Sequence, residues 1–183
     1  MRTVYIGMGA NLPGPAGTPE ATLAAAAQRL GLLGRVTARS ALYSTAPVGF
    51  VEQPRFINAA VVLETELEPR ELLKALLGIE REFGRDRSAA IPNGPRTLDL
   101  DILLIEGVEV SEPGLEIPHP RLFERAFALI PLNEIAPEAR DPRTGRSVGE
   151  WLQRLVCGEG SGRAGAQCVT PFQSELWRGS AGS

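Results

Sequence analysis

The chain has 183 residues, of which 43% are hydrophobic and 22% are charged, and its formal net charge is −3. This composition is typical of one globular domain and excludes a fully disordered chain, a collagen and a coiled coil. No stretch approaches the roughly 18 uncharged apolar residues of a membrane helix, and the acidic balance argues against nucleic-acid binding. Because the two cysteines are too few for a disulfide framework and no secretory leader is visible, we expect a cytoplasmic protein. We also expect a monomer that binds neither nucleic acid nor membranes.

Hydrophobic periodicity and turn residues divide the first part of the chain into strands and helices. Thr18, Pro19 and Glu20 form a helix start, since Thr can cap, Pro fits the first helical position and Glu favours the positive end. A nearly all-apolar run over residues 56–65 indicates a central strand. In chain order we expect a strand over 3–9, a helix from 19 to 31–34, strands over 36–45 and 56–65, a helix from 69 to 84, and a strand over 98–105.

This order, β-α-β-β-α-β, resembles the ferredoxin-like pattern. It predicts an α+β fold, in which helices pack on the faces of an antiparallel sheet. Further elements follow the pattern: a short hairpin with residues 108–110, an extended stretch over 117–120, and helices over 126–135 and 147–156.

The composition changes at Cys157, after which glycine and serine dominate. We expect residues 1–156 to form the domain and residues 157–183 to form a mobile tail, and we expect deletion of residues 158–183 to leave activity intact. The alternative is that Val169–Phe172 and Leu176-Trp177 dock on the domain.

Asp99 and Asp101 are the sharpest chemical feature of the sequence. Because side chains alternate along a strand, the two carboxylates share one face, and Leu98, Leu100, Ile102 and Leu104 share the other. Two carboxylates about 6.5–7 Å apart at Cα can converge on Mg²⁺, which then keeps waters and takes substrate phosphates as further ligands. The alternative is an edge strand with a solvated polar face.

A polar loop with Arg85, Arg87 and Arg96 comes directly before this strand. Arginines beside a carboxylate pair are what phosphoryl transfer requires, because cations neutralise the phosphate oxygens. The alternative is a solvated surface loop. No P-loop or protein-kinase motif is present.

Four further residues are candidates for substrate contacts. His119, the single histidine, could donate to a phosphate or move a proton, although a lone histidine is more often structural. Asn58 lies in an apolar strand and could bind the edge of a heterocycle, or simply satisfy backbone groups. Phe56 and Phe127 could stack on a flat ring, or belong to the core.

Together these residues resemble the family of 6-hydroxymethyl-7,8-dihydropterin pyrophosphokinases, enzymes of folate synthesis. The resemblance covers residues 3 to about 156. Its strongest block is Gly94-Pro95-Arg96-Thr97-Leu98-Asp99-Leu100-Asp101-Ile102. The other blocks, in the same order as in the family, are 6–12, 43–49, 56–61, 80–87, 117–121, 125–127 and 131–137.

The resemblance implies that pyrophosphate passes from ATP to the pterin's hydroxymethyl oxygen and that AMP leaves. It implies two Mg²⁺ ions held by Asp99 and Asp101, and loops at 11–17, 46–55 and 84–96 that close over both substrates. It assigns catalytic roles to Arg85, Arg96, Asp99 and Asp101. It assigns ATP binding to Glu80, Arg87, Arg96, Ile102, His119 and Arg125. It assigns pterin binding to Thr45, Val48, Phe56, Asn58 and Phe127.

Two other functions stay open at this point. A carboxylate-metal phosphohydrolase would turn over without a pterin acceptor, but would leave Phe56, Asn58 and Phe127 without a role. A non-catalytic nucleotide-binding module would not need both aspartates.

Overall fold

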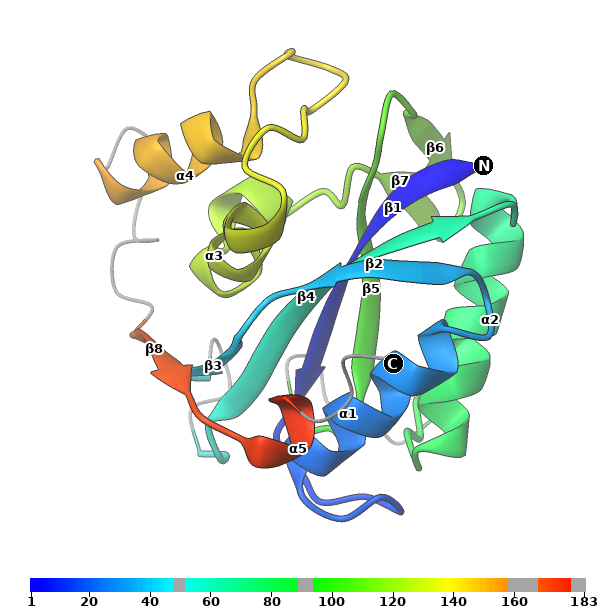
Figure 1. The fold of residues 1–183 in the computed structure, drawn as a ribbon, viewed down its shortest axis with the longest axis vertical. Coiled ribbons are helices and arrows are strands. Elements are labelled where there is room, and N and C mark those ends of the chain that lie inside the picture. The colour runs from blue at the N-terminus through cyan, green and yellow to red at the C-terminus, as the bar shows by residue number, and fades with distance from the viewer. Residues whose placement is uncertain (48–51, 89–93, 158–167, 179–183) are drawn as a thin grey trace.

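Figure 1 shows a computed structural model of the chain, which describes residues 1–47, 52–88, 94–157 and 168–178. The strands are β1 (Arg2–Ala10), β2 (Arg35–Arg39), β3 (Leu42–Thr45), β4 (Phe56–Thr65), β5 (Asp99–Ile105), β6 (Val110–Glu112), β7 (Leu115–Ile117) and β8 (Val169–Phe172). The helices are α1 (Pro19–Leu30), α2 (Pro69–Glu82), α3 (Ala126–Ile135), α4 (Val148–Val156) and α5 (Glu175–Arg178), with a 3₁₀ turn over Leu122–Glu124. No helix in these described ranges is both long and apolar enough to cross a membrane.

The main sheet has the strand order β5-β1-β4-β3-β8, with β2 also paired to β4. All of its pairings are antiparallel. β4 lies inside the sheet, between β1 on one side and β2 and β3 on the other, as its apolar sequence predicts. The α+β class and the antiparallel sheet with helices on its faces are confirmed.

Local signals in the sequence set the helix boundaries. Thr18 Oγ1 accepts a hydrogen bond from the Ala21 N–H at the start of α1, and Pro19 occupies the first turn. Glu68 and Ser147 open α2 and α4 with capping boxes, in which a glutamate of the first turn binds back to the cap N–H. Gly84 follows α2 with φ of +81°, a conformation that glycine adopts without strain.

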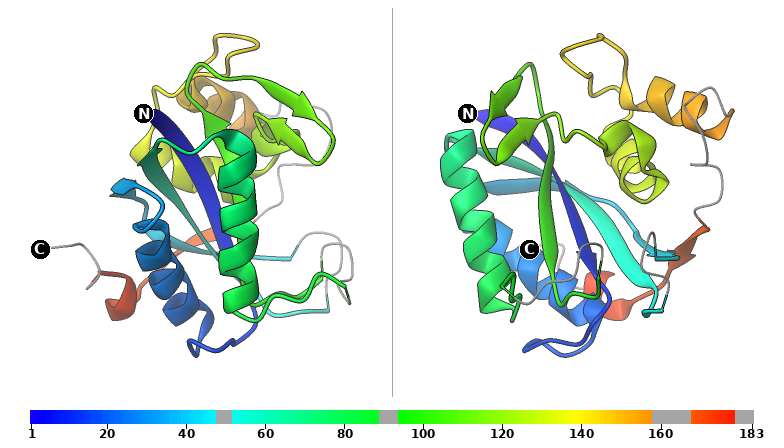
Figure 2. Two further views of the ribbon diagram at one scale, coloured as in Figure 1. Left: turned by 90° about the vertical axis from the view of Figure 1, so that its right-hand side faces the viewer. Right: turned by 180° about the vertical axis from the view of Figure 1, so that it is seen from behind.

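The two faces of the sheet carry separate apolar cores. α1 and α2 cover one face, and α3 and α4 cover the other (Figure 2). Leu98, Leu100 and Ile102 belong to the α1–α2 core, as the period of two predicts. Leu104 does not join them, because the pairing of β5 with β1 shifts between Tyr5 and Ile6, and Leu104 packs in the α3–α4 core instead. This β-bulge corrects the expected alternation at the end of the strand.

Three predicted elements differ in the structure. The strand predicted over 36–45 is divided into β2 and β3, which both pair with β4, because the regular strand pairing is interrupted at Ser40 and Ala41. The hairpin predicted with residues 108–110 is reduced to one bridge between Ile105 and Val108, and β6 pairs with β7 instead. The stretch predicted as extended over 117–120 turns after β7, where the Ile117–Pro118 peptide is cis.

The prediction of a mobile tail from residue 157 onward is wrong for residues 168–178. β8 adds to the edge of the sheet beside β3, and α5 packs against α1. Trp177 is buried, and the alternative in which this segment docks on the domain is the one the structure contains. The predicted boundary between residues 156 and 157 stays a prediction.

Candidate active site

Asp99 and Asp101 lie on the α3 face of β5, directly across from two glycines of β1. The register pairs Asp99 with Gly9 and Asp101 with Gly7. A Cβ at Gly9 would lie 2.8 Å from Asn58 Oδ1, and a Cβ at Gly7 would lie 3.1 Å from a methyl group of Leu103. The glycines therefore leave room for the side chains of Asn58 and Leu103 on the face that carries the carboxylates.

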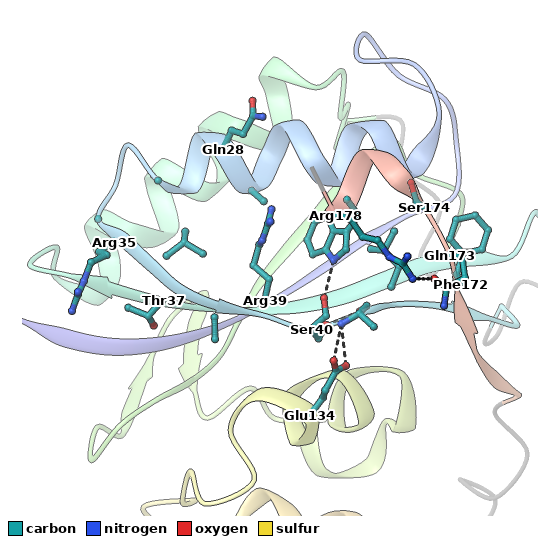
Figure 3. A pocket seen from close by; sticks show the side chains of 18 residues that line it. Gln28, Arg35, Thr37, Arg39, Ser40, Glu134, Phe172, Gln173, Ser174 and Arg178 are labelled. Carbon is teal, nitrogen blue, oxygen red and sulfur yellow. Dashed lines mark hydrogen bonds between the residues drawn. The ribbon is translucent and has the colours of Figure 1, made fainter. Parts of the chain in front are cut away.

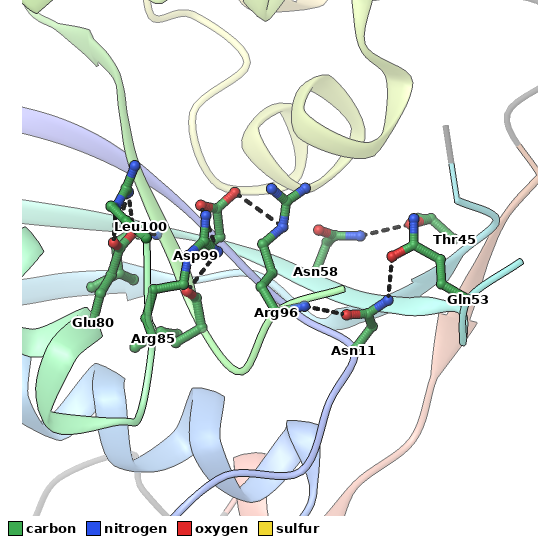
Figure 4. A network of polar contacts seen from close by, with 11 residues as sticks. Asn11, Thr45, Gln53, Asn58, Glu80, Arg85, Arg96, Asp99 and Leu100 are labelled. Atoms are coloured by element: carbon green, nitrogen blue, oxygen red, sulfur yellow. Dashed lines mark hydrogen bonds and ion pairs between the residues drawn. The ribbon is translucent and has the colours of Figure 1, made fainter. Parts of the chain in front are cut away.

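Two loop arginines converge on Asp99. Arg85 Nη1 lies 3.2 Å from Asp99 Oδ1, and Arg96 Nε lies 3.6 Å from Asp99 Oδ2. Arg85 also donates to the Leu98 carbonyl at 3.0 Å, which fixes the guanidinium against the start of β5. Figure 4 shows Arg85, Asp99 and Arg96 in one row with Asn58. β5 is an edge strand, but its polar face carries this charge cluster and is not simply solvated.

The charges around Asp101 differ from those around Asp99. In the described part of the chain Asp101 makes no ion pair, whereas Asp99 makes two. Burial, and after it the negative charge of Asp99, raises the pKa of Asp101 from an ordinary value of 3.8 to about 7. Two ionised carboxylates this close repel each other, and a cation bound between them would offset that repulsion.

The donor set fits Mg²⁺ with phosphate ligands. Two carboxylates are hard oxygen ligands, and no cluster of three or more His, Cys, Asp or Glu that could hold a metal occurs among the described residues. Bound water and substrate phosphates would complete the coordination. Arg85 Nε, Arg96 Nε and Thr97 Oγ1 are buried without a hydrogen-bond partner in the described structure. Such donors fit the oxygens of a bound polyphosphate.

Glu80 is a buried carboxylate beside this cluster, and Arg87 is bound to it. The Arg87 guanidinium donates to both carboxylate oxygens of Glu80, at 2.6 to 2.9 Å. The Leu100 N–H also donates to Glu80, at 2.9 Å. Glu80 is 1% exposed and ties α2 to β5 through these bonds, whereas Arg87 is half-exposed.

Thr45, Asn58 and Phe56 lie on the same face of the sheet, beside Arg96. Asn58 Nδ2 donates to Thr45 Oγ1 at 2.7 Å, and both side chains are buried. The Arg96 guanidinium carbon lies 4.9 Å from the centre of the Phe56 ring, a cation–π geometry. The structure therefore brings a polar pair and an aromatic ring next to the charge cluster.

His119 and Arg125 reach the same face from the segment before α3. His119 Nδ1 accepts from the Arg121 N–H at 3.2 Å, which leaves the proton of a neutral ring on Nε2. Burial lowers the pKa of His119, and the positive charge of Arg125 lowers it further. The Arg125 guanidinium carbon lies 5.5 Å from the centre of the Phe127 ring at the start of α3.

One predicted site residue within the described ranges, Ile102, is not brought to this cluster. The Ile102 side chain packs in the α1–α2 core, on the face of β5 opposite the aspartates. Val48 lies outside the described residues.

Sequence reasoning missed Asn11, which joins three segments at the end of β1. Its Oδ1 accepts from the Arg96 N–H at 2.8 Å. Its Nδ2 donates to Gln53 Oε1 at 3.0 Å and to the Pro54 carbonyl at 2.9 Å. From the sequence, Asn11 was placed only in a loop over residues 11–17, and no local pattern marked it as a contact between segments. In the structure it is a polar residue that is 3% exposed directly after a buried strand.

Comparison with known proteins agrees with this geometry. The model of the family described as 7,8-dihydro-6-hydroxymethylpterin-pyrophosphokinase (HPPK) matches residues 5–137. The chain belongs to this family. The predicted family membership is thus confirmed.

Two bacterial relatives match over nearly their whole length. A 2-amino-4-hydroxy-6-hydroxymethyldihydropteridine pyrophosphokinase of Methylorubrum extorquens is 45% identical over 157 residues, which cover 85% of this chain and 94% of that protein. The Pseudomonas aeruginosa protein of the same name is 43% identical, over 83% of this chain and 91% of its own. A mitochondrial folate synthesis bifunctional protein of Arabidopsis thaliana is 43% identical over 78% of this chain, which spans 27% of that larger protein.

Solved structures share the fold. The wild-type HPPK-DHPS of Plasmodium falciparum with pteroate matches 85% of this chain and 44% of that chain, with a TM-score of 0.66 and 15% identity. At this identity the likeness supports the fold alone.

Proposed function

We propose that this chain transfers pyrophosphate from ATP to the hydroxymethyl oxygen of 6-hydroxymethyl-7,8-dihydropterin, in folate synthesis. The pterin oxygen bonds to the β-phosphorus, the bond between that phosphorus and the bridging oxygen of the α-phosphate breaks, and AMP leaves. One observation carries the proposal: the carboxylate and arginine cluster and the Thr45–Asn58 pair lie side by side on one face of the sheet. A polyphosphate and a heterocycle could therefore bind next to each other.

Asp99 and Asp101 would hold Mg²⁺, which we expect as two ions. When bound, Mg²⁺ supplies positive charge that offsets the negative charge of the phosphate oxygens. The chain's own contribution is positioning and charge. Arg85 and Arg96 are fixed against Asp99 and would donate to the triphosphate, and buried donors act strongly because water competes little with them.

We assign the remaining polar groups by their place around this cluster. Glu80 orients Arg87 toward the phosphates, so its part in ATP binding is indirect. His119 and Arg125 would contact ATP from the segment before α3, and Ile102 could contribute through its backbone alone. Thr45, Asn58 and Val48 would bind the pterin edge, with Phe56 and Phe127 contacting its ring. A monomeric state and a cytoplasmic location stay predictions of the sequence.

The test is AMP formation from ATP and Mg²⁺ with and without 6-hydroxymethyl-7,8-dihydropterin. Pterin-dependent AMP without ADP is the expected result. ADP or free phosphate that forms without pterin would instead support a phosphohydrolase. Binding of both ligands without any product would support a non-catalytic module.

A further inference from the structure

We propose that residues 168–178, here called the C-terminal strap, position the pterin-binding side of the active site. The strap holds both ends of the loop between β3 and β4. This inference rests on the proposed function for the identity of the substrate. The strap lies beyond residues 5–137, the part of the chain that the family model matches.

Trp177 fixes the end of the strap to the domain. The side chain is 7% exposed and packs in the core between the sheet and α1. Its Nε1 donates to the Ser40 carbonyl at 2.8 Å, and the Arg39 guanidinium carbon lies 4.9 Å from the ring centre. Figure 3 shows Ser40, Arg39 and Phe172 around this anchor point. They line a groove of about 1010 Å³, which lies on the face of the sheet opposite the aspartates. A buried tryptophan with its N–H satisfied is a strong anchor.

β8 converts β3 from an edge strand into an interior strand. β3 has only four residues, and it pairs with β4 on one side and with β8 on the other, where Thr45 lies opposite Val169. Short edge strands are held weakly, because one of their two sides lacks hydrogen-bond partners. Pro171 limits further growth of the sheet beyond β8, since it has no N–H to donate.

The Cys168 carbonyl binds both described ends of the loop that joins β3 to β4. It accepts from the Ala46 N–H at 3.4 Å and from Arg55 Nη2 at 3.0 Å. Arg55 also donates to Ser44, through Nε to the hydroxyl at 2.9 Å and through Nη2 to the carbonyl at 3.1 Å. The first and last parts of the loop are therefore joined through the strap.

These anchors are next to the polar pair proposed for the pterin. Thr45, whose hydroxyl accepts from Asn58, is bonded in sequence to Ala46 and paired in register with Val169. The aspartates lie on β5, at the opposite edge of the sheet from β8. Releasing the strap should therefore loosen the pterin side of the site and leave the phosphate side unchanged.

The experiment compares Trp177→Ala, Arg55→Gln and a chain that ends at Cys157 with the wild type. KM for pterin and KM for ATP are measured separately, at a temperature well below each Tm. We expect KM for pterin to rise at least about fivefold in all three variants, while KM for ATP and kcat stay within about twofold. Hydrogen exchange at the Ala46 amide should accelerate in the first and third variants.

Two matched control variants separate the effect of releasing the strap from the general effects of a substitution. Leu176→Ala changes an exposed residue of the same short helix, and Arg35→Gln removes an exposed arginine that pairs with Glu64 on the outer part of the sheet. Both should keep wild-type KM values. An unchanged KM for pterin in Trp177→Ala and Arg55→Gln, with only a lower Tm, would overturn the proposal, as would equal increases in both KM values.

Failure of the proposed function would look different. A wild-type chain without pterin-dependent AMP formation would reject the function itself, and Ala46 exchange would then decide whether the strap holds the loop. If the shortened chain does not fold, the two point variants still decide the proposal.

Discussion

Replacing Asp101 with asparagine should stabilise the metal-free protein while it removes activity. Asp101 makes no ion pair in the described structure, and its pKa is raised to about 7 by burial and by Asp99. The ionised carboxylate is therefore unfavourable in the folded state. Asparagine keeps the shape of the side chain and removes the charge, so it should relieve this cost.

The size of the expected gain in stability follows from the pKa of Asp101. An increase from 3.8 to about 7 corresponds to at most about 4 kcal/mol, at about 1.4 kcal/mol per pH unit. Solvent and relaxation reduce this value, so we expect a gain of about 1–2 kcal/mol at pH 8, or roughly 2–8 °C in Tm. Because the folded pKa lies above the unfolded one, wild-type stability falls as pH rises from about 4 to 7. The advantage of asparagine should therefore shrink as the pH is lowered from 7 toward 4.

The assay is thermal unfolding in EDTA between pH 4 and 8, together with pterin-dependent AMP formation in Mg²⁺. Turnover should fall by at least about 10², the cost of losing one charge-stabilising group. Asp141→Asn is the matched control, because Asp141 is buried but accepts from the Arg143 N–H and the Thr144 hydroxyl. It should lower Tm and leave KM values unchanged. A lower Tm for Asp101→Asn in EDTA at pH 8 would refute the electrostatic argument, and turnover within tenfold of wild type would refute the two-carboxylate metal site.

Three further outcomes are expected. Arg96→Ala should reduce turnover by about 10² with little change in Tm, because its guanidinium faces the cluster; a large loss in thermal unfolding would show that Arg96 is structural instead. Gly9→Ala should raise KM for pterin, because its Cβ would lie 2.8 Å from Asn58 Oδ1; a KM equal to the wild-type value would contradict this placement. Mg²⁺ should raise Tm more at pH 8 than at pH 6, because protons compete for Asp101, whose pKa is about 7; a gain independent of pH would argue that Mg²⁺ binds elsewhere.

Local sequence determined most of the secondary structure. The caps at Thr18, Glu68 and Ser147 mark where helices begin, because each satisfies N–H groups within the same turn. The face shared by Asp99 and Asp101 follows from the period of a strand, and this short-range geometry was enough to predict the carboxylate pair. Their placement with Arg85 and Arg96 was predicted from adjacency in the chain, and the ion pairs agree with it.

Other features depend on contacts between distant segments. Asn11 contacts two distant segments because β1 ends beside both Arg96 and Gln53. No local sequence pattern indicates this proximity. Leu104 changes face because of a bulge against β1, and a one-residue shift in pairing reverses every later side chain.

Helices α1 to α4, the main strands, the carboxylate pair and the family could be predicted from the sequence, because these depend on residues close together in the chain. The position of the C-terminal residues depends on tertiary contacts. The signals in residues 168–178 are weak, since four strand residues and one helical turn have little stability alone. Their order comes from Trp177 in the core beside α1 and from pairing with β3, more than 120 residues earlier in the chain.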